Sequence, residues 1–286
     1  MHEFTQEVEE LAKAVMEYSL ERLKSNPPLD GPRSEQDLYA ELGNTITPQG
    51  LGGKQTLKVF TETLALACIS TDHPRNLAFI PSAPSEYANL FDLVVGASSL
   101  YGGSWQEGAG GVFAENQALK WLIDIAGLPK NAGGVFVQGG TMGNLSALVV
   151  ARDQARKAHP KVKRWVIACS AESHSSITSA AHVMDVDVLK VATNSENRLD
   201  GVHVAAAIDE LHANSDSRVF AIVGTAGTTN LGIVDDLATL AECAQKRNIW
   251  FHVDGAYGLA GLCAPSVRHL FNGVERADSF IVDPHK

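Results

Sequence analysis

Apolar side chains recur every three or four positions near the start of the chain, which predicts an amphipathic helix over residues 4–22. Asn26-Pro27-Pro28 ends this helix, because proline removes a backbone donor that a helix needs. A second short helix is predicted over residues 34–42, between a serine cap and a glycine stop. We therefore expect residues 1–53 to form a helical N-terminal arm whose apolar stripe needs a partner.

The rest of the pattern predicts one large α/β domain over residues 54–286. Apolar residues spaced as in a helix predict helices over residues 54–70, 86–100 and 111–126. From residue 133, β-branched runs predict strands at 134–138, 164–169, 186–191, 219–224, 249–254 and 279–282. Further helices are predicted between them at 143–158, 175–184, 202–213 and 237–247. This alternation favours a mostly parallel sheet between helices, with ligands bound at the carboxyl ends of the strands.

Composition and charge narrow the classes of function. The 286 residues are 45% apolar and carry a formal net charge of −10, so phosphate backbones and anionic lipids would repel the chain as a whole. No apolar run approaches the roughly 20 residues of a membrane span, and the acidic start differs from a signal peptide. Four scattered cysteines without a CxxC pair favour buried, reduced thiols. We expect a cytoplasmic protein that binds neither nucleic acid nor membranes.

A glycine-rich turn follows the first predicted strand, with the sequence Gln138-Gly139-Gly140-Thr141-Met142-Gly143-Asn144. Glycines allow close backbone approach, and the free N–H groups of a helix start, together with a threonine hydroxyl, suit a phosphate group. The same turn could be a plain strand-to-helix connection. It is neither a P-loop nor a dinucleotide-binding fingerprint.

Two other turns at the same edge carry polar side chains. In Ala171-Glu172-Ser173-His174-Ser175-Ser176, the His174 imidazole could stack on a planar ring or move protons, or could only cap a helix. Gly224-Thr225-Ala226-Gly227-Thr228-Thr229 is either a turn or one wall of a small-molecule site.

The last two predicted strands end on charged residues. Asp254 closes an apolar strand, where a buried carboxylate needs a cation or several donors. His252 and Asp254 lack a third ligand at a usual spacing, so we predict no metal site, and a heterocyclic cation is the better partner. Lys286 follows the sixth strand. A lysine beside an anion-binding turn, a stacking histidine and a buried aspartate is what pyridoxal phosphate requires.

Five sequence blocks in this order resemble the pyridoxal-phosphate-dependent group II amino-acid decarboxylases, which include aromatic-amino-acid, glutamate, tyrosine and diaminobutyrate decarboxylases. The blocks are residues 73–82, 138–144, 171–176, 252–257 and 277–286. The resemblance implies a fold-type I (aspartate-aminotransferase-like) large domain with pyridoxal 5'-phosphate as cofactor. It also implies a homodimer in which the N-terminal arm wraps the other subunit.

The resemblance assigns roles to residues at the matching positions. Lys286 would form a Schiff base with the cofactor, and Asp254 would keep the pyridine nitrogen protonated. His174 would stack on one ring face and Ala256 would pack on the other. The remaining assignments are Gly140, Thr141, Met142, Ser279 and His285 for the phosphate side, Thr225 near the ring substituents, and Ser82 and Trp105 in the substrate pocket.

The implied reaction is the decarboxylation of an L-amino acid to the amine and CO2 by a carbon–carbon lyase. Asp283 stands where animal aromatic-amino-acid decarboxylases carry asparagine, which favours a bacterial-type member. Family members continue beyond the residue that Lys286 matches, so we expect the large domain to be incomplete and the small C-terminal domain to be absent.

Three alternatives stay open. A related fold-type I enzyme could catalyse aldehyde formation, aldol cleavage or transamination with the same cofactor. A Rossmann-like module could bind a nucleotide without pyridoxal phosphate. The chain could also be an inactive fragment or a remnant interaction module.

Overall fold

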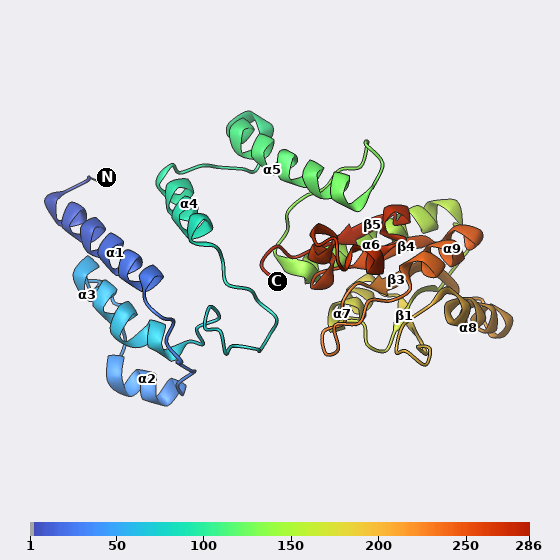
Figure 1. Ribbon diagram of the computed structural model, residues 1–286, viewed down its shortest axis with the longest axis horizontal. Helices are drawn as coiled ribbons and strands as arrows, with labels where there is room; N and C mark the ends of the chain where they lie inside the picture. Colours follow the sequence, from blue (N-terminus) through green and yellow to red (C-terminus); the bar gives the residue numbers. More distant parts are fainter. Residues whose placement is uncertain (1–2) are drawn as a thin grey trace. The chain divides into compact units, whose positions relative to one another are not determined.

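The computed structural model describes residues 3–286, which form two compact units (Figure 1). The first unit comprises residues 3–98 and His285, and the second comprises residues 99–284 and Lys286. The expected division between an arm and a large domain at residue 53 stays a prediction, because the two units are defined by contacts and not by independent folding.

Helices provide the regular structure of the first unit. They are α1 (Gln6–Lys24), α2 (Glu35–Leu42), α3 (Gly53–Val59) and α4 (Glu86–Ala97). The Ser34 hydroxyl accepts a hydrogen bond from an N–H of the first turn of α2, and Gly43 at φ +62° ends that helix, as the sequence predicts.

The helix predicted over residues 54–70 is shorter and interrupted. Helix α3 ends at Val59. A π-helical segment (Phe60–Leu64) and a 3-10 turn (Ala65–Ala67) follow it directly. The Thr61 hydroxyl donates to the Lys58 carbonyl at 3.3 Å. Side-chain bonds of this kind compete with the backbone ladder and bend helices.

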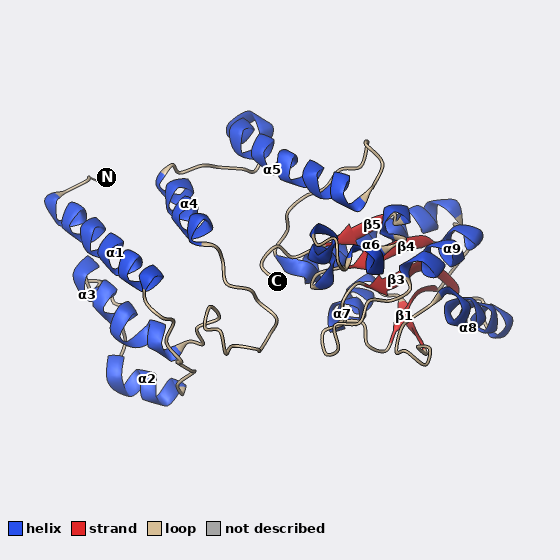
Figure 2. Ribbon diagram, viewed as in Figure 1, coloured by secondary structure: helices blue, strands red, loops and turns tan. Residues whose placement is uncertain are grey.

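A parallel five-stranded sheet forms the centre of the second unit (Figure 2). Its strands are β1 (Trp165–Ser170), β2 (Asp187–Val191), β3 (Arg218–Thr225), β4 (Trp250–Asp254) and β5 (Ser279–Ile281), in the order β2-β1-β3-β4-β5. The helices are α5 (Trp105–Ala126), α6 (Gly139–Ala158), α7 (Ser175–Met184), α8 (Gly201–Asn214) and α9 (Leu237–Arg247). Short 3-10 helices lie at Gly258–Cys263, Arg268–Phe271 and Val274–Arg276. This confirms the predicted α/β class with a parallel sheet.

Alternate residues of the strands face two separate hydrophobic clusters. Ile167 and Cys169 of β1 pack with Leu148 of α6 and with α7, whereas Val166 and Ala168 pack with α8 and α9. This alternation follows from the period of two in a β-strand, and it explains why both faces of the sheet are apolar.

The strand predicted over residues 134–138 is wrong. The segment is extended but pairs with no strand of the described chain, and Val135, Phe136 and Val137 stay exposed. Instead of joining a ladder, the Phe136 N–H donates to the Glu115 carboxylate at 3.1 Å. Strand character in a sequence cannot produce a strand without a neighbour to supply the hydrogen bonds.

Smaller corrections concern helix starts and cysteines. Helix α5 begins at Trp105 instead of 111, with a non-helical kink at Gly108, and α6 begins at Gly139 instead of 143. All four cysteines are free, but Cys68 and Cys263 are exposed where we expected buried thiols. Among residues 3–286, no helix is both long and apolar enough to span a membrane.

Candidate active site

The carboxyl ends of three neighbouring strands bring the predicted residues of the second unit together. Thr225 of β3 lies in register with Asp254 of β4, which lies in register with Ile281 of β5. Helix α6, which begins with the glycine turn, packs on all three of these strands. The site therefore forms where parallel α/β sheets bind ligands.

Asp254 is a buried carboxylate held by neutral donors. Its side chain is on a residue only 4% exposed, Oδ2 accepts from Asn144 Nδ2 at 2.9 Å, and Oδ1 accepts from the Ala256 N–H at 3.2 Å. No lysine or arginine of the described chain pairs with it. A carboxylate in this setting keeps lone pairs for a cation and gains from receiving one.

His252 lies on the same face of β4 and is fully buried. Its Nε2 is 2.8 Å from Asn144 Oδ1, and its Nδ1 is 2.8 Å from Ser279 Oγ. Burial lowers the pKa of His252 to about 4, although the nearby Asp254 carboxylate opposes the shift. The imidazole is therefore neutral at physiological pH.

The glycine turn forms a cradle at the start of α6. Gly139 has φ +77°, a conformation that favours glycine, and the N–H groups of the first helical turn have no partner within the helix. A Cβ placed on Gly140 would lie 3.3 Å from both the Ala256 Cβ and Asp283 Oδ2. Thr141 and Met142 in the same turn are exposed, so their donors are available to an anion.

Lys286 lies next to this cradle. Its Nζ is 2.9 Å from Asp283 Oδ2, and its backbone N–H donates to the Asp283 carbonyl at 3.1 Å. The Asp283 N–H in turn donates to the Ala256 carbonyl at 3.2 Å, which ties the segment after β5 to the segment after β4. The carboxylate thus holds the Lys286 ammonium at the edge of the sheet.

Thr225 presents a buried hydroxyl at the same edge. Its Oγ1 has no hydrogen-bond partner among the described residues, although the residue is only 4% exposed. The Thr225 backbone is fixed by Asp235, whose Oδ2 accepts from the Thr225 N–H at 2.8 Å. Burial raises the pKa of Asp235 to about 6.

His174 is the N-cap of α7 and is exposed. Its Nδ1 accepts from the Ser176 N–H at 3.2 Å and lies 2.9 Å from Ser176 Oγ. The capping interpretation is thus confirmed, and the role of the His174 ring in stacking or proton transfer stays a prediction.

Four of the predicted residues are not gathered by these contacts. The Ser279 hydroxyl lies between Trp250 Nε1 and His252 Nδ1, both at 2.8 Å, within the sheet. Trp105 is 59% exposed at the start of α5. The other two, Ser82 and His285, are exposed, and the roles of all four stay predictions.

The residues present fit pyridoxal phosphate, the cofactor that the resemblance implies. The buried Asp254 suits a pyridinium nitrogen, the unpartnered Thr225 hydroxyl suits a ring substituent, and the glycine cradle suits a phosphate. Among the described residues, no cluster of three or more His, Cys, Asp or Glu could hold a metal ion.

Sequence reasoning missed Asn144, Ser176 and the structural role of His252. A signal was available for His252, because it and Asp254 are two residues apart and therefore share one face of a strand that is otherwise apolar. Nothing in the sequence pairs Asn144 with them, since 108 residues separate Asn144 from His252.

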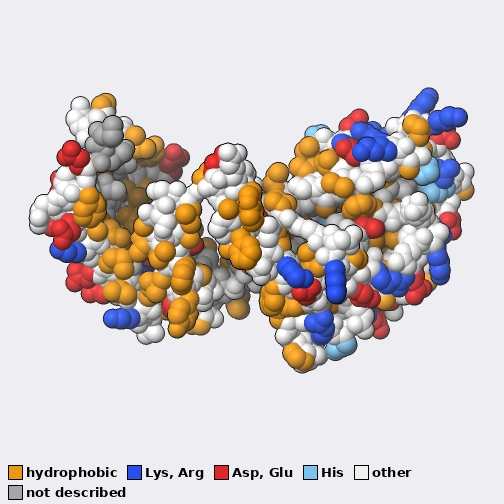
Figure 3. Space-filling model, turned by 90° about the horizontal axis from the view of Figure 1, so that it is seen from above, with side chains coloured by type: hydrophobic (Ala, Val, Ile, Leu, Met, Phe, Trp, Pro, Cys, Tyr) orange, Lys and Arg blue, Asp and Glu red, His pale blue; other side chains and the backbone are white. Residues whose placement is uncertain are grey.

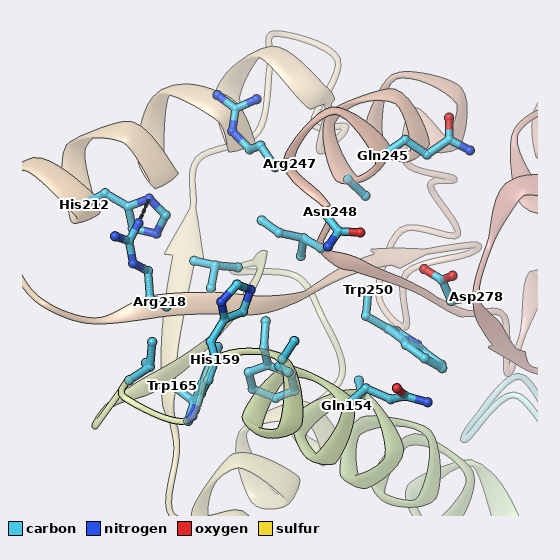
Figure 4. A pocket seen from close by; sticks show the side chains of 18 of the residues that line it. Gln154, His159, Trp165, His212, Arg218, Gln245, Arg247, Asn248, Trp250 and Asp278 are labelled. Atoms are coloured by element: carbon cyan, nitrogen blue, oxygen red, sulfur yellow. Dashed lines mark hydrogen bonds between the residues drawn. The ribbon is translucent and has the colours of Figure 1, made fainter.

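A cavity of about 1180 Å³ lies at the opposite, amino edge of the sheet (Figure 4). Among its polar groups, Arg247 pairs with Asp209 at 3.0 Å, and an Arg218 guanidinium nitrogen lies 3.3 Å from His212 Nδ1. Trp250 also lines this cavity, so β4 runs from the cavity wall to Asp254.

Comparisons with known proteins agree with this arrangement. The conserved domain of pyridoxal-dependent decarboxylases matches residues 47–286. The chain is 30% identical over 271 residues to an aromatic-L-amino-acid decarboxylase of Bacillus atrophaeus, covering 93% of this chain and 55% of that protein. It is 32% identical over 219 residues to an L-2,4-diaminobutyrate decarboxylase of Rhizobium meliloti, covering 75% of this chain and 43% of the relative.

Solved structures show the same fold. The chain superposes with a TM-score of 0.87 and 30% identity on the glutamate decarboxylase domain of a Vibrio parahaemolyticus diaminobutyrate-pyruvate transaminase and L-2,4-diaminobutyrate decarboxylase. That match covers 98% of this chain and 63% of the Vibrio chain. The chain thus spans about half the length of the curated relatives it matches.

Proposed function

The chain belongs to the pyridoxal-dependent decarboxylase family, and from this premise we propose that it decarboxylates an L-amino acid to the amine and CO2. The observation that carries the proposal is the buried Asp254, which has only neutral donors and lies at the same edge as Lys286 and the glycine cradle. Pyridoxal 5'-phosphate, when bound, would supply the electron sink that takes up the electrons of the broken Cα–carboxylate bond.

The residues of this chain would divide the work. Asp254 would hold the cationic ring nitrogen, and the first turn of α6 would bind the phosphate through backbone N–H groups. Lys286 would supply the amine that binds the cofactor covalently, and Asp283 would hold a proton at Lys286 Nζ. His174 would cover one face of the ring and shield it from water, while Ala256 would leave room for the ring on the other side.

The decisive experiment is loss of the covalent link in Lys286→Ala. We expect the full chain to develop the visible absorption band of lysine-bound pyridoxal phosphate, and borohydride followed by mass spectrometry to place the cofactor on Lys286. Lys286→Ala should show neither. Lys246→Ala, which changes an exposed lysine of α9, should behave like the unaltered chain. Nucleotide binding without the band would favour the Rossmann-like alternative.

Product analysis separates the reactions that share this cofactor. The chain is incubated with aromatic amino acids, glutamate and diaminobutyrate, and CO2, amine and aldehyde are measured. Amine and CO2 in equal amounts support the proposal, whereas aldehyde without amine contradicts it.

We also propose a homodimer, supported by the exposed apolar surface of the first unit. Helix α4 has no buried residue, yet apolar side chains cover most of its circumference, among them Leu90, Phe91, Leu93, Val94 and Val95. On the face shown in Figure 3, hydrophobic side chains gather over the first unit. A broad apolar surface of this kind is normally buried, and a second copy of the chain would bury it.

The arm contributes less unpartnered surface than its sequence predicts. Helix α1 packs on α3, and the Lys54 ammonium pairs with Glu10 at 2.8 Å. Phe4, Val8 and Leu20 remain exposed. Deletion of residues 4–24 should still lower dimer stability in sedimentation experiments, and an unchanged dimer would show that the stripe is used within one chain.

A further inference from the structure

A continuous chain of hydrogen bonds connects the amino edge of β4 with Asp254 and His174. The bonds are Trp250 Nε1 to Ser279 Oγ (2.8 Å), Ser279 Oγ to His252 Nδ1 (2.8 Å), His252 Nε2 to Asn144 Oδ1 (2.8 Å), Asn144 Nδ2 to Asp254 Oδ2 (2.9 Å), Asn144 Nδ2 to Ser176 Oγ (2.9 Å) and Ser176 Oγ to His174 Nδ1 (2.9 Å). We call these residues the β4 relay.

The first half of the β4 relay has only one consistent direction. The indole of Trp250 can only donate, so Ser279 Oγ accepts from it, and a serine hydroxyl could still accept from or donate to His252 Nδ1. The other end of the chain of bonds decides between the two, because an ionised Asp254 takes Asn144 Nδ2 and leaves Asn144 Oδ1 to accept from His252 Nε2, so Nδ1 of the neutral ring accepts from Ser279 Oγ. In the neutral imidazole, Nε2 then carries the hydrogen and donates to Asn144 Oδ1. The pKa of His252, lowered to about 4 by burial, is consistent with this neutral form.

The second half fixes the side-chain amide of Asn144. An ionised Asp254 can only accept, so the amide must present Nδ2 to it and Oδ1 to His252. With both ends of the amide occupied, a rotation of Asn144 would bring Oδ1 against the carboxylate and leave His252 Nε2 unpaired. Such a rotation is costly in a buried site, because it creates an oxygen–oxygen contact and an orphaned donor.

We propose that Asn144 and His252 are positioning residues that hold the Asp254 carboxylate in place for the cationic ring nitrogen of the cofactor. The proposal rests on the proposed function, because only a cationic heterocycle gives Asp254 its role. Asn144 also donates to Ser176 Oγ, but His174 keeps its bond from the Ser176 N–H without this contact, so the role proposed for Asn144 concerns Asp254. The Ser279 hydroxyl contacts His252 in this arrangement, and its expected role on the phosphate side stays a prediction.

The test compares paired variants of the full chain. Asn144→Leu removes all three hydrogen bonds of the amide, and His252→Phe removes the donor while keeping a ring. His252→Gln can still donate to Asn144 and is the conservative rescue. Ser146→Ala, an exposed position of the same helix, is the matched control. Dissociation constants for pyridoxal phosphate are measured from the visible absorption band, and circular dichroism verifies the fold.

We expect affinity for pyridoxal phosphate to fall about tenfold or more in Asn144→Leu and His252→Phe, because hydrogen bonds to a charged group are the strong ones. His252→Gln and Ser146→Ala should stay within about twofold of the unaltered chain.

A cofactor analogue with carbon in place of the ring nitrogen provides the sharper comparison. It keeps the aldehyde and the phosphate but makes no use of Asp254. If Asn144 acts through Asp254, Asn144→Leu and the unaltered chain should bind the analogue equally well. Equal affinity of Asn144→Leu and the unaltered chain for pyridoxal phosphate itself would overturn the proposal, and so would an equal loss for both ligands. If the unaltered chain binds neither ligand, the proposed function fails as well, which makes the two failures distinguishable.

Discussion

The two units of this molecule bury their apolar side chains to very different extents. In the second unit, strands and helices enclose two clusters in which residues such as Leu148, Ile222 and Leu240 are fully buried. In the described part of the first unit, Thr63 is the one residue that is buried, and large apolar side chains of α4 are exposed. The helices of the two units nevertheless have similarly amphipathic or apolar sequences.

This contrast teaches that an apolar helix indicates burial without saying against what. The second unit supplies the partner itself, because its sheet offers both faces to the helices. The helices of the first unit bury little of their surface against one another. Its exposed apolar side chains therefore indicate a partner outside the unit.

Equal leucine truncations should differ most between the units. Leu240→Ala in α9 removes a side chain that is 0% exposed and should lower the free energy of unfolding by about 3 kcal/mol. Leu93→Ala in α4, where the side chain is 49% exposed, should cost less than about 0.5 kcal/mol in dilute solution. Urea denaturation below the concentration of self-association measures both. Equal losses would show that α4 is already buried within one chain.

A charge on α4 should act on association and not on folding. Phe91→Asp introduces a carboxylate on this surface and should weaken self-association about tenfold or more in analytical ultracentrifugation, because a buried charge without a partner is costly. Val183→Asp, at an equally exposed position of α7, is the control. If both variants dimerise like the unaltered chain, α4 is not the interface.

Acid should affect the second unit through two buried groups that oppose each other. His252 has a pKa lowered from 6.5 to about 4, so its contribution to the free energy of unfolding decreases as pH falls from 6.5 toward 4. Asp235 has a pKa raised from 3.8 to about 6, so its contribution to the free energy of unfolding increases as pH falls from 6 toward 3.8. In His252→Gln only the second contribution remains. The free energy of unfolding of this variant, relative to that of the unaltered chain, should rise by up to about 1.4 kcal/mol for each pH unit below pH 6.5.

Denaturation at a series of pH values measures this difference, and it should be constant above pH 7.5. A constant difference down to pH 4 would contradict the assignment of His252 as a neutral buried base. In the first unit, the lowered pKa of Glu10 comes from its bonds with Lys54 at the exposed surface. Salt should therefore remove its small contribution, whereas it should leave the contributions of the buried groups largely intact.

The fold of the second unit was predictable wherever periodicity and burial coincide. Strands β1, β3 and β4 and helices α7 and α9 begin and end within about two residues of the expected positions, as is usual for element boundaries. The strand predicted at residues 134–138 does not form because a strand needs a neighbouring strand, which no local sequence pattern encodes. The prediction of one continuous helix over residues 54–70 is wrong because threonine hydroxyls bond to helix carbonyls there.

The site was predictable only where residues follow strands directly. Asp254, Thr225 and Lys286 were expected at the carboxyl edge from their place in the chain, and the structure brings them to that edge. The β4 relay depends on side chains from two helices and two strands that meet only after folding. The direction of its hydrogen bonds follows from tertiary contacts, so no sequence spacing could have indicated it.

The strand order also has a consequence for how the site assembles. Strand β3 pairs with β1, β4 with β3 and β5 with β4, so after β2 the sheet extends along one edge in the order of synthesis. The residues that follow β5, with Lys286 among them, are therefore synthesised after the helix that carries the glycine turn, and we expect them to dock on a sheet that is already largely formed. Because non-local parallel pairing is slow, we expect cofactor capture during refolding to lag behind the formation of the sheet.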